Sequence, residues 1–262
     1  MRSLREMPVA LTIAGSDSGG GAGIQADLKT FAAVGVHGTS AITCLTAQNP
    51  KAVIGIQACK TEMVSRQLEA VFAELRPAAA KTGMLLSTAI IRTVADFLKA
   101  QRFHPLVLDP VMVATSGAML LKRDAITALR RQLLPLAMVV TPNLDEAQVL
   151  LRRQITSLTE LQQAARELTD TFGVPFLVKG GHLRQLPRAI DILYDGRQLH
   201  EFSAPVVHGI QTHGTGCAYS AAIAAHLALG ADLLEAVGRA KVFVTKTIRD
   251  SIRVGKFTAL NL

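Results

Sequence analysis

Aromatic residues and long apolar runs are both scarce in this chain. Tryptophan is absent and aromatic residues make up only 4% of the sequence, whereas Ala, Val, Ile and Leu dominate its apolar content. Such a composition is typical of parallel strands that are covered by helices on both faces. The longest apolar stretch, around residues 218–237, is interrupted by His226, Asp232 and Glu235, so it cannot span a bilayer. We therefore expect no membrane partner.

Cysteines are too few and too far apart to form a disulfide framework or a zinc site. The chain has three, Cys44, Cys59 and Cys217, which is an odd number with wide spacing. A short apolar run at 9–14 follows two arginines, but it is too short for a signal peptide and is followed directly by Asp17. We read this run as a first strand and expect a protein of the reducing cytoplasm.

Clustered positive charge is also missing, although the formal net charge is +8 and the sequence pI is about 9.8. The Lys and Arg residues are dispersed along the chain, and the densest group is only Arg152-Arg153. Dispersed charge is typical of a solvated surface and attracts anionic small molecules as well as nucleic acid. A nucleotide is therefore a better candidate partner than DNA or RNA, and we expect no nucleic-acid partner.

Short β-branched segments alternate with longer helical ones throughout the 262 residues. This alternation predicts one domain, 1–262, with a three-layer α/β/α sandwich and a mostly parallel sheet. Asp195-Gly196 between two alternating runs at 189–203 predicts an antiparallel hairpin at one edge. The expected strands are 9–15, 40–48, 53–59, 78–85, 106–113, 138–143 and 176–181, and the expected helices are 24–34, 61–75, 88–100, 124–133, 144–151, 159–172, one after Cys217 and 233–252.

The loop after the first strand is rich in glycine and carries Gly15, Ala22 and Asp27. Gly21, Gly23 and Ala26 match a dinucleotide fingerprint, but the acidic residue required about twenty positions later is absent. No lysine follows the glycines, so the loop is not a phosphate-binding P-loop either. A glycine-lined wall for a flat ligand fits this loop better.

Polar or adaptable residues stand at the ends of two further strands. Gln48 ends the second strand, where its amide offers donors and an acceptor to a heterocycle, or else caps its own loop. Met84 follows another strand and either lines a pocket or belongs to the core. Ligands of open α/β sheets bind at the carboxyl ends of strands, so these positions are candidates for substrate binding.

Charged residues follow the later strands. Asp109 is placed to hold a metal or to cap a loop, and Lys179 is placed beside free backbone amides as a phosphate neighbour. Asn143 and Glu146 have the spacing of a capping box, so a structural explanation suffices for both. We assign no role to His182 or His213.

A second glycine-rich segment, residues 213–217, opens an alanine-rich helix. Free backbone N–H groups at the helix start make an anion hole from Gly214, Thr215 and Gly216, and the same field should acidify the thiol of Cys217. An ordinary loop-to-helix junction with a buried cysteine is the alternative. Together with the strand-end groups, however, the segment supplies what phosphoryl transfer requires, which is positioning and charge neutralisation.

Seven motifs in this order resemble the hydroxymethylpyrimidine/phosphomethylpyrimidine kinase family of thiamine biosynthesis, which has the ribokinase-like fold. The resemblance runs from about residue 9 to 250, and its first and last motifs are highly specific. The motifs are AGSDSGGGAGIQADLKT (14–30), AQN (47–49), KTGML (81–85), DPVM (109–112), TPN (141–143), VKGGH (178–182) and THGTGC (212–217).

The resemblance implies a phosphotransferase that uses ATP and Mg²⁺ to phosphorylate 4-amino-5-hydroxymethyl-2-methylpyrimidine and then its monophosphate. It implies a substrate pocket formed by Gln48, Gly15, Ala22, Asp27, Met84 and Val111. It also places Asp109 and Glu146 near the metal, Asn143 and Lys179 near the nucleotide, and Gly214, Thr215, Gly216 and Cys217 around the transferred group. Cys217 stands where sugar kinases of this fold carry an aspartate base, but a thiolate is poorly matched to a hydroxyl group, so positioning should contribute most of the rate. We also expect a homodimer.

Three positions depart from the family pattern. Thr82 stands where the family usually has Ile, Thr115 where it has a lid Lys, and Gln211 where it has Asn. The missing lysine removes one phosphate contact and bears on the second phosphorylation. Related pyridoxal kinases carry a lid cysteine where this chain has Ala114, so pyridoxal or pyridoxine is the alternative substrate. A non-catalytic pyrimidine- or nucleic-acid-binding protein is a third, more remote possibility.

Overall fold

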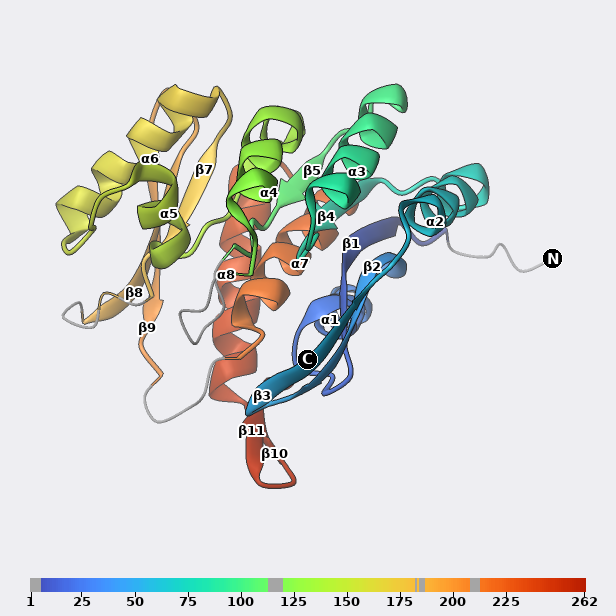
Figure 1. The fold of residues 1–262 in the computed structure, drawn as a ribbon. Coiled ribbons are helices and arrows are strands. Elements are labelled where there is room, and N and C mark those ends of the chain that lie inside the picture. The colour runs from blue at the N-terminus through green and yellow to red at the C-terminus, as the bar shows by residue number, and fades with distance from the viewer. Residues whose placement is uncertain (1–5, 113–119, 182, 184–186, 208–212) are drawn as a thin grey trace.

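The computed structural model describes residues 6–112, 120–181, 183, 187–207 and 213–262 (Figure 1). Within these residues, a nine-stranded sheet has the order β3-β2-β1-β4-β5-β6-β7-β8-β9. Its strands are β1 (Val9–Asp17), β2 (His37–Asn49), β3 (Ala52–Ala58), β4 (Ala79–Thr82), β5 (Leu106–Leu108), β6 (Val139–Val140), β7 (Phe176–Lys179), β8 (Arg188–Tyr194) and β9 (Leu199–Pro205).

The six central strands, from β2 to β7, are parallel, and both edges are antiparallel. The hairpin expected at 189–203 forms one edge as β8 and β9, which confirms the predicted fold class. At the other edge β3 turns back along β2, an arrangement the sequence pattern did not indicate. The two residues between β2 and β3, Pro50 and Lys51, are too few for a parallel crossover, so β3 has to pair antiparallel.

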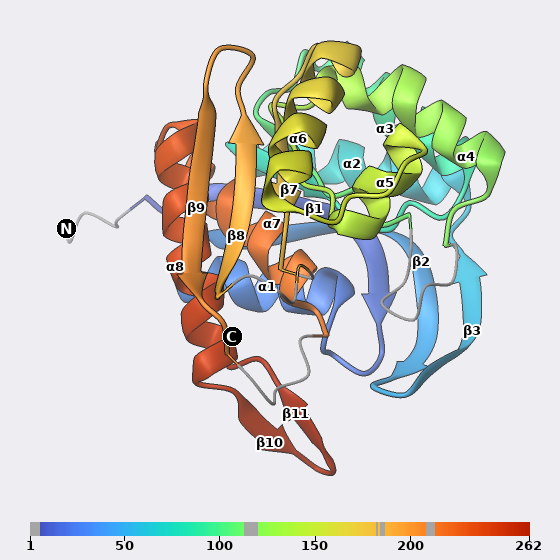
Figure 2. The ribbon, with the colours of Figure 1, turned by 90° about the vertical axis from the view of Figure 1, so that its left-hand side faces the viewer.

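Helices cover both faces of the sheet (Figure 2). One face carries α1 (Gly23–Val34), α7 (Thr215–Ala228) and α8 (Leu233–Arg249). The other carries α2 (Thr61–Glu74), α3 (Thr88–Ala100), α4 (Arg123–Ala128), α5 (Leu144–Leu151) and α6 (Leu158–Phe172), and α4 continues through a π-turn and a 3-10 turn at 129–136. Two separate hydrophobic clusters result, one on each side of the sheet.

The alanine-rich helix α7 is the most enclosed of the helices described. Ten of its 14 residues are buried, from Ala218 to Ala228, because α7 packs against the sheet and against both α1 and α8. Small side chains allow these backbones to approach closely on several sides, and a helix that is apolar all round is a buried one. The position of α7 fixes its N-terminal end against the sheet.

Several boundaries differ from the sequence expectation. Strands β5 and β6 are only three and two residues long, because the chain leaves the sheet directly before Pro110 and Pro142. An additional hairpin, β10 (Ile252–Val254) and β11 (Phe257–Ala259), follows α8. Its strands are too short for a periodic signal.

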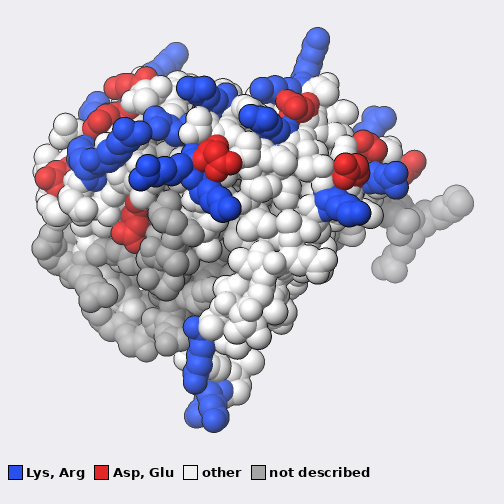
Figure 3. Space-filling view, viewed as in Figure 1, with Lys and Arg blue, Asp and Glu red and all other residues white. Residues whose placement is uncertain are grey.

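The described helices include none that is long and apolar enough to cross a membrane. On the face shown in Figure 3, basic side chains lie among acidic ones over the helices, and further basic side chains lie at the tip where the β10–β11 hairpin lies. This distribution is the dispersed pattern expected from the sequence.

Candidate active site

Asp17, at the end of β1, organises the glycine-rich loop. Its carboxylate accepts hydrogen bonds from the backbone N–H groups of Gly19 (2.8 Å), Gly21 (3.1 Å) and Ala22 (2.8 Å). Burial alone would raise the pKa of Asp17, but the neighbouring His213 and the N–H groups of Gly19 and Ala22 lower it below its ordinary value. Sequence analysis assigned Asp17 no role in the site, although an aspartate two residues before glycine is a signal for such a turn.

The two glycine-rich segments pack directly against each other. Gly214 precedes α7 with φ +83, and a Cβ at this position would overlap the carbonyl oxygen of Gly21. Gly23 has φ +56, and its Cβ would overlap the carbonyl oxygen of Gly15. Only glycine fits both the positive φ and the close approach at these two positions. The first turn of α7 therefore lies against the loop that follows β1.

Gly15, Cys44 and Met84 lie together at the carboxyl ends of β1, β2 and β4. A Cβ on Gly15 would lie 2.8 Å from the Cys44 Sγ and 3.1 Å from the Met84 Cε. The Met84 backbone is held by a hydrogen bond of 2.6 Å from the Thr43 hydroxyl to its carbonyl oxygen. The structure thus places Met84 against the glycine segment, and it is partly exposed, unlike a core residue.

Val111 follows the short strand β5 and Pro110 in a strained conformation. Its φ is +42, which β-branched residues rarely adopt, and its side chain is partly exposed. The next residue, Met112, is buried and its N–H donates to Glu146 at 3.0 Å. Strained residues concentrate at ligand sites, where the surrounding structure holds them in place.

Lys179, Asp109 and Gly216 meet on the other side of the site. The Lys179 Nζ lies 3.5 Å from the Asp109 Oδ1, and the Ser220 hydroxyl of α7 donates to the Asp109 Oδ2 at 3.2 Å. A Cβ on Gly216 would lie 3.4 Å from the Lys179 Nζ and 3.9 Å from the Asp109 Oδ2. The first turn of α7 therefore faces both a cation and a carboxylate, which is the arrangement predicted for the transferred phosphoryl group.

Asn143 and Glu146 form the capping box that their spacing predicts at the start of α5. The Asn143 side chain accepts from the Glu146 N–H, and the Glu146 Oε2 accepts from the Asn143 N–H, both at 2.9 Å. Glu146 is only 2% exposed. Burial, and next the charge of Asp109, raise the pKa of Glu146 to about 7 despite Lys179 and two backbone hydrogen bonds. The predicted roles of Asn143 near the nucleotide and of Glu146 near the metal stay predictions.

Asp27, which the resemblance places in the substrate pocket, forms a buried ion pair, and its contact with the substrate stays a prediction. It is fully buried, both of its oxygens lie 3.0–3.1 Å from the Lys81 Nζ, and the Thr12 hydroxyl donates to it at 2.6 Å. Burial alone would lower the pKa of Lys81, but the negative charges of Asp27 and Asp109 raise it, so the lysine is charged. We assign Asp27 to an ion pair beneath the site, in which it neutralises Lys81. Lys81 itself was not singled out from the sequence.

Cys217 lies in the first turn of α7, but its thiol is not acidified. Burial raises the pKa of Cys217 to about 11, and the charge of Lys81 and the Gly23 N–H compensate only in part. The expected acidification was therefore wrong, because desolvation of the thiolate outweighs the field of the helix start. Cys217 is a neutral thiol at pH 7.

His213, to which the sequence analysis gave no role, contacts two residues of the opposite loops. Its Nε2 lies 3.3 Å from the Gln48 Nε2 and 3.9 Å from the Asp17 Oδ2. Gln48 is partly exposed at the end of β2, and its side-chain amide contacts Thr46 and His213. His182, Ala114, Thr115 and Gln211, on which earlier expectations fell, lie outside the described residues.

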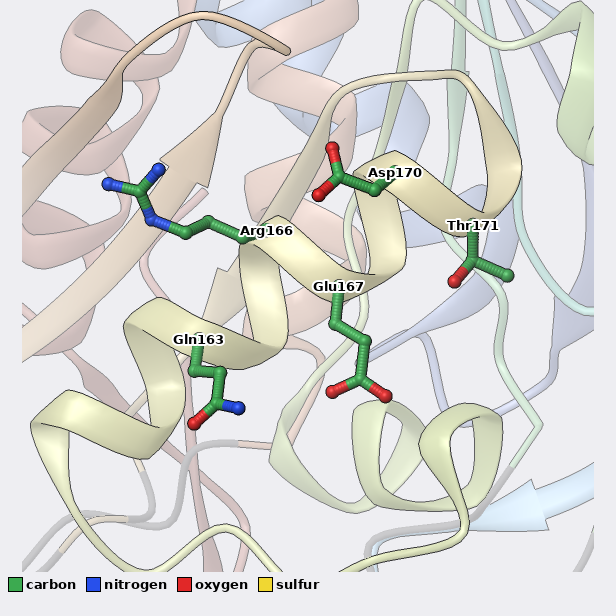
Figure 4. A pocket seen from close by; sticks show the side chains of 5 residues that line it. All are labelled: Gln163, Arg166, Glu167, Asp170 and Thr171. Carbon is green, nitrogen blue, oxygen red and sulfur yellow. The ribbon is translucent and has the colours of Figure 1, made fainter.

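A hollow elsewhere on the surface is lined by α6 alone. Gln163, Arg166, Glu167, Asp170 and Thr171 surround it, and their side chains point in different directions from one helix (Figure 4). None of these residues follows a strand. The hollow therefore contributes nothing to the site described above.

A magnesium ion would have to be held largely by groups other than protein side chains. In the parts of the chain that the structure describes, no group of three or more His, Cys, Asp or Glu residues is arranged to hold a metal. Asp109 nevertheless offers a carboxylate beside Lys179, and Mg²⁺ in phosphoryl-transfer sites typically takes one or two carboxylates together with waters and phosphates. The donor set fits such an ion.

A ribokinase-like sheet with polar residues at its strand ends, and a lysine beside a helix start, are features of a small-molecule kinase. A family model described as phosphomethylpyrimidine kinase matches residues 17–260. The chain belongs to the phosphomethylpyrimidine kinase family and is a phosphotransferase.

Individual relatives agree with this family. The chain is 48% identical to hydroxymethylpyrimidine/phosphomethylpyrimidine kinase of Synechococcus elongatus over 250 residues. This alignment covers 95% of each protein. It matches phosphomethylpyrimidine kinase of Clostridium difficile with a TM-score of 0.82 and 40% identity, over 92% of this chain and 99% of that one. It also matches an ADP complex of Bacillus subtilis pyridoxal kinase with a TM-score of 0.90 and 37% identity, over 97% of both.

Proposed function

We propose that this chain transfers the γ-phosphoryl group of ATP to 4-amino-5-hydroxymethyl-2-methylpyrimidine and then to its monophosphate, as a step of thiamine biosynthesis. The observation that carries the proposal is the contact of the two glycine-rich loops at Gly214 and Gly21. This contact brings a heterocycle-binding side, with Gln48 and Met84, next to a phosphate-binding side, with Lys179 and Gly216.

Binding and orientation account for most of the chemistry available to these residues. Glycine at position 15 leaves room for the Cys44 thiol and the Met84 methyl group to pack against the backbone there. Gln48 hydrogen-bonds the aminopyrimidine, while Gly15, Ala22, Met84 and Val111 enclose its ring. The hydroxymethyl group of the substrate is thereby directed toward the first turn of α7.

The phosphate side neutralises charge. The Lys179 ammonium group and the N–H groups of Gly214, Thr215 and Gly216 stabilise the transferred phosphoryl oxygens, and Asn143 lies toward the nucleotide. Asp109 and Glu146 would hold Mg²⁺, which would reduce the negative charge of the phosphates. Cys217, as a neutral thiol, orients the hydroxyl group instead of acting as a strong base.

A substrate panel with Mg-ATP and mass detection tests this function. Conversion of the hydroxymethylpyrimidine to its monophosphate and diphosphate is the expected result. If the pyrimidine is left unphosphorylated while pyridoxal is converted rapidly, the proposal is wrong and the alternative takes its place. The likeness to Bacillus subtilis pyridoxal kinase is the observation that keeps pyridoxal in the panel.

A non-catalytic pyrimidine- or nucleic-acid-binding protein, the remote possibility raised by the sequence, does not agree with membership of a phosphotransferase family. It requires tight DNA binding that weakens steeply with salt, together with no kinase activity. The mixture of basic and acidic side chains in Figure 3 argues against it.

We propose that two copies of the chain form a homodimer. The edge strand β3 exposes Val53, Ile54 and Ile56 by 46%, 78% and 47%, which is an unusual apolar surface for an edge strand. Light scattering behind size exclusion tests this proposal, and a monomer mass at all concentrations would refute it. The cytoplasm remains the expected compartment.

A further inference from the structure

The backbone of Gln48 is fixed, but its terminal amide is not. The Gln48 N–H donates to the Ser18 Oγ, and the Ser18 hydroxyl donates to the Gln48 carbonyl oxygen, both at 2.8 Å. These two bonds hold the end of β2 against the loop that follows β1. Rotation of the side-chain amide remains free, and it exchanges Oε1, an acceptor, with Nε2, a donor.

Thr46 cannot fix this rotation alone. Its hydroxyl lies 3.2 Å from the Gln48 Oε1 and 2.9 Å from the carbonyl oxygen of Ser16. A hydroxyl has one proton, and the shorter contact to Ser16 competes for it. When Thr46 donates to Ser16, its lone pairs accept equally well from a reversed amide.

His213 can fix the rotation. Its Nε2 lies 3.3 Å from the Gln48 Nε2, which is only a donor, so the two atoms hydrogen-bond in the tautomer that accepts at Nε2 and carries its proton on Nδ1. The ring has room here because position 21 is glycine: a Cβ on Gly21 would lie 3.3 Å from the His213 Cδ2. In that tautomer, which the inference requires, a reversed amide would put an oxygen against the imidazole lone pair, which is repulsive.

We propose that His213 is a positioning residue that fixes the order of donor and acceptor on Gln48 and thereby selects 4-aminopyrimidines over 4-oxopyrimidines. The inference rests on the proposed function. A 4-aminopyrimidine presents a ring nitrogen acceptor beside an amino donor, and the 4-oxo compound presents N–H beside C=O, in the reverse order. An amide held in one orientation pairs with the first and leaves polar groups unpaired against the second, at a cost of about tenfold in affinity or more.

The test is calorimetry on the full chain with 4-amino-5-hydroxymethyl-2-methylpyrimidine and its 4-oxo analogue. We expect the wild type to prefer the amino compound by about tenfold or more, and His213→Phe to lose most of this preference because the amide turns freely. His213→Gln, whose side-chain oxygen also accepts, should recover part of it. His200→Phe is the matched control, because His200 contacts Asp195 at 2.9 Å near the β8–β9 turn, outside the site.

Each outcome decides the inference. An unchanged preference in a folded His213→Phe overturns it and leaves the proposed function intact. If His213→Phe does not show the thermal unfolding transition of the wild type, His213→Ala is measured in its place. A wild-type preference for the amino compound in His213→Ala then overturns the inference and leaves the proposed function intact. A wild type that binds the oxo compound as tightly as the amino compound also overturns the inference. A wild type that binds neither compound overturns the proposed function together with it.

Discussion

The Lys81 ammonium group lies 3.0 Å from the Asp27 carboxylate, and neither side chain has any exposed surface. The pair sits at the boundary between α1 and β4, beneath the site that the glycine-rich loops form. Two buried charges at this position are tolerated because each neutralises the other and Thr12 provides a further hydrogen bond.

Removing one partner of this ion pair should destabilise the fold strongly. Lys81→Met leaves the Asp27 carboxylate buried without a cation, so we expect a loss of about 3–5 kcal/mol in the free energy of unfolding. Urea denaturation measures this loss, and adding Asp27→Leu should recover much of it. The control is Arg153→Met, because Arg153 pairs with Glu167 at the surface and its removal should cost below about 1 kcal/mol. Equal effects of the two single changes would contradict the explanation.

Cys217 should react slowly with thiol reagents at neutral pH. Its pKa of about 11 means that the reactive thiolate is a small fraction at pH 7 and rises about tenfold per pH unit up to that value. Alkylation by iodoacetamide between pH 7 and 10, followed by peptide mass analysis, measures the profile. A rate that is already constant at pH 7 would show an acidified thiol.

Cys217→Ser should retain the fold and lower turnover. The serine hydroxyl is a smaller group that still hydrogen-bonds, so positioning is weakened without a buried cavity of methyl size. Steady-state kinetics with the pyrimidine measures this decrease. Turnover equal to that of the wild type would leave the cysteine with a packing role alone.

Gly214→Ala should reduce activity by much more than the strain of an alanine at a positive φ would cause. The added Cβ overlaps the Gly21 carbonyl oxygen and would separate the two glycine-rich loops. Gly230→Ala is the control: Gly230 also has a positive φ, +89, but nothing lies near its Cβ position. We expect about 1 kcal/mol of destabilisation in the control with near-normal kcat/KM, and a loss of kcat/KM above about 100-fold for Gly214→Ala. Similar kinetics of the two variants would contradict the role of the loop contact.

Gln48→Ala should mainly weaken binding of the pyrimidine. The amide lies at the end of β2 beside His213, away from Lys179, so ATP affinity should change little. Calorimetry with each ligand separates the two effects. Unchanged pyrimidine affinity would remove Gln48 from the substrate site.

The parallel core of the fold was predictable from the sequence because its signals are local. The alternation of elements, the 189–203 hairpin and the capping box of Asn143 and Glu146 all follow from short stretches of chain. A strand at 53–59 was expected, but its antiparallel pairing at a sheet edge was not, and the β10–β11 hairpin was not expected at all, because both pairings depend on turns and contacts instead of periodicity.

The sequence indicates candidate site residues where they follow a strand. It does not indicate the burial, the pKa or the partner of a residue when these depend on contacts between distant segments. Asp27 was expected in the pocket, but its pairing with Lys81, 54 positions later, buries it. The pKa of Cys217 depends on how deeply α7 packs, which the sequence of one helix does not contain. His213 gained its role from a contact with Gln48 across 165 positions.

The most direct test of the account is the turnover of Lys179→Met with the hydroxymethylpyrimidine and Mg-ATP. Lys179 faces Asp109 and the first turn of α7, so its loss should reduce kcat by about 100-fold or more and leave the pyrimidine dissociation constant within about twofold. Lys246→Met, on the exposed side of α8, is the control and should behave as the wild type. A Lys179→Met enzyme that forms the monophosphate at the wild-type rate would contradict the assignment of this strand end to phosphoryl transfer.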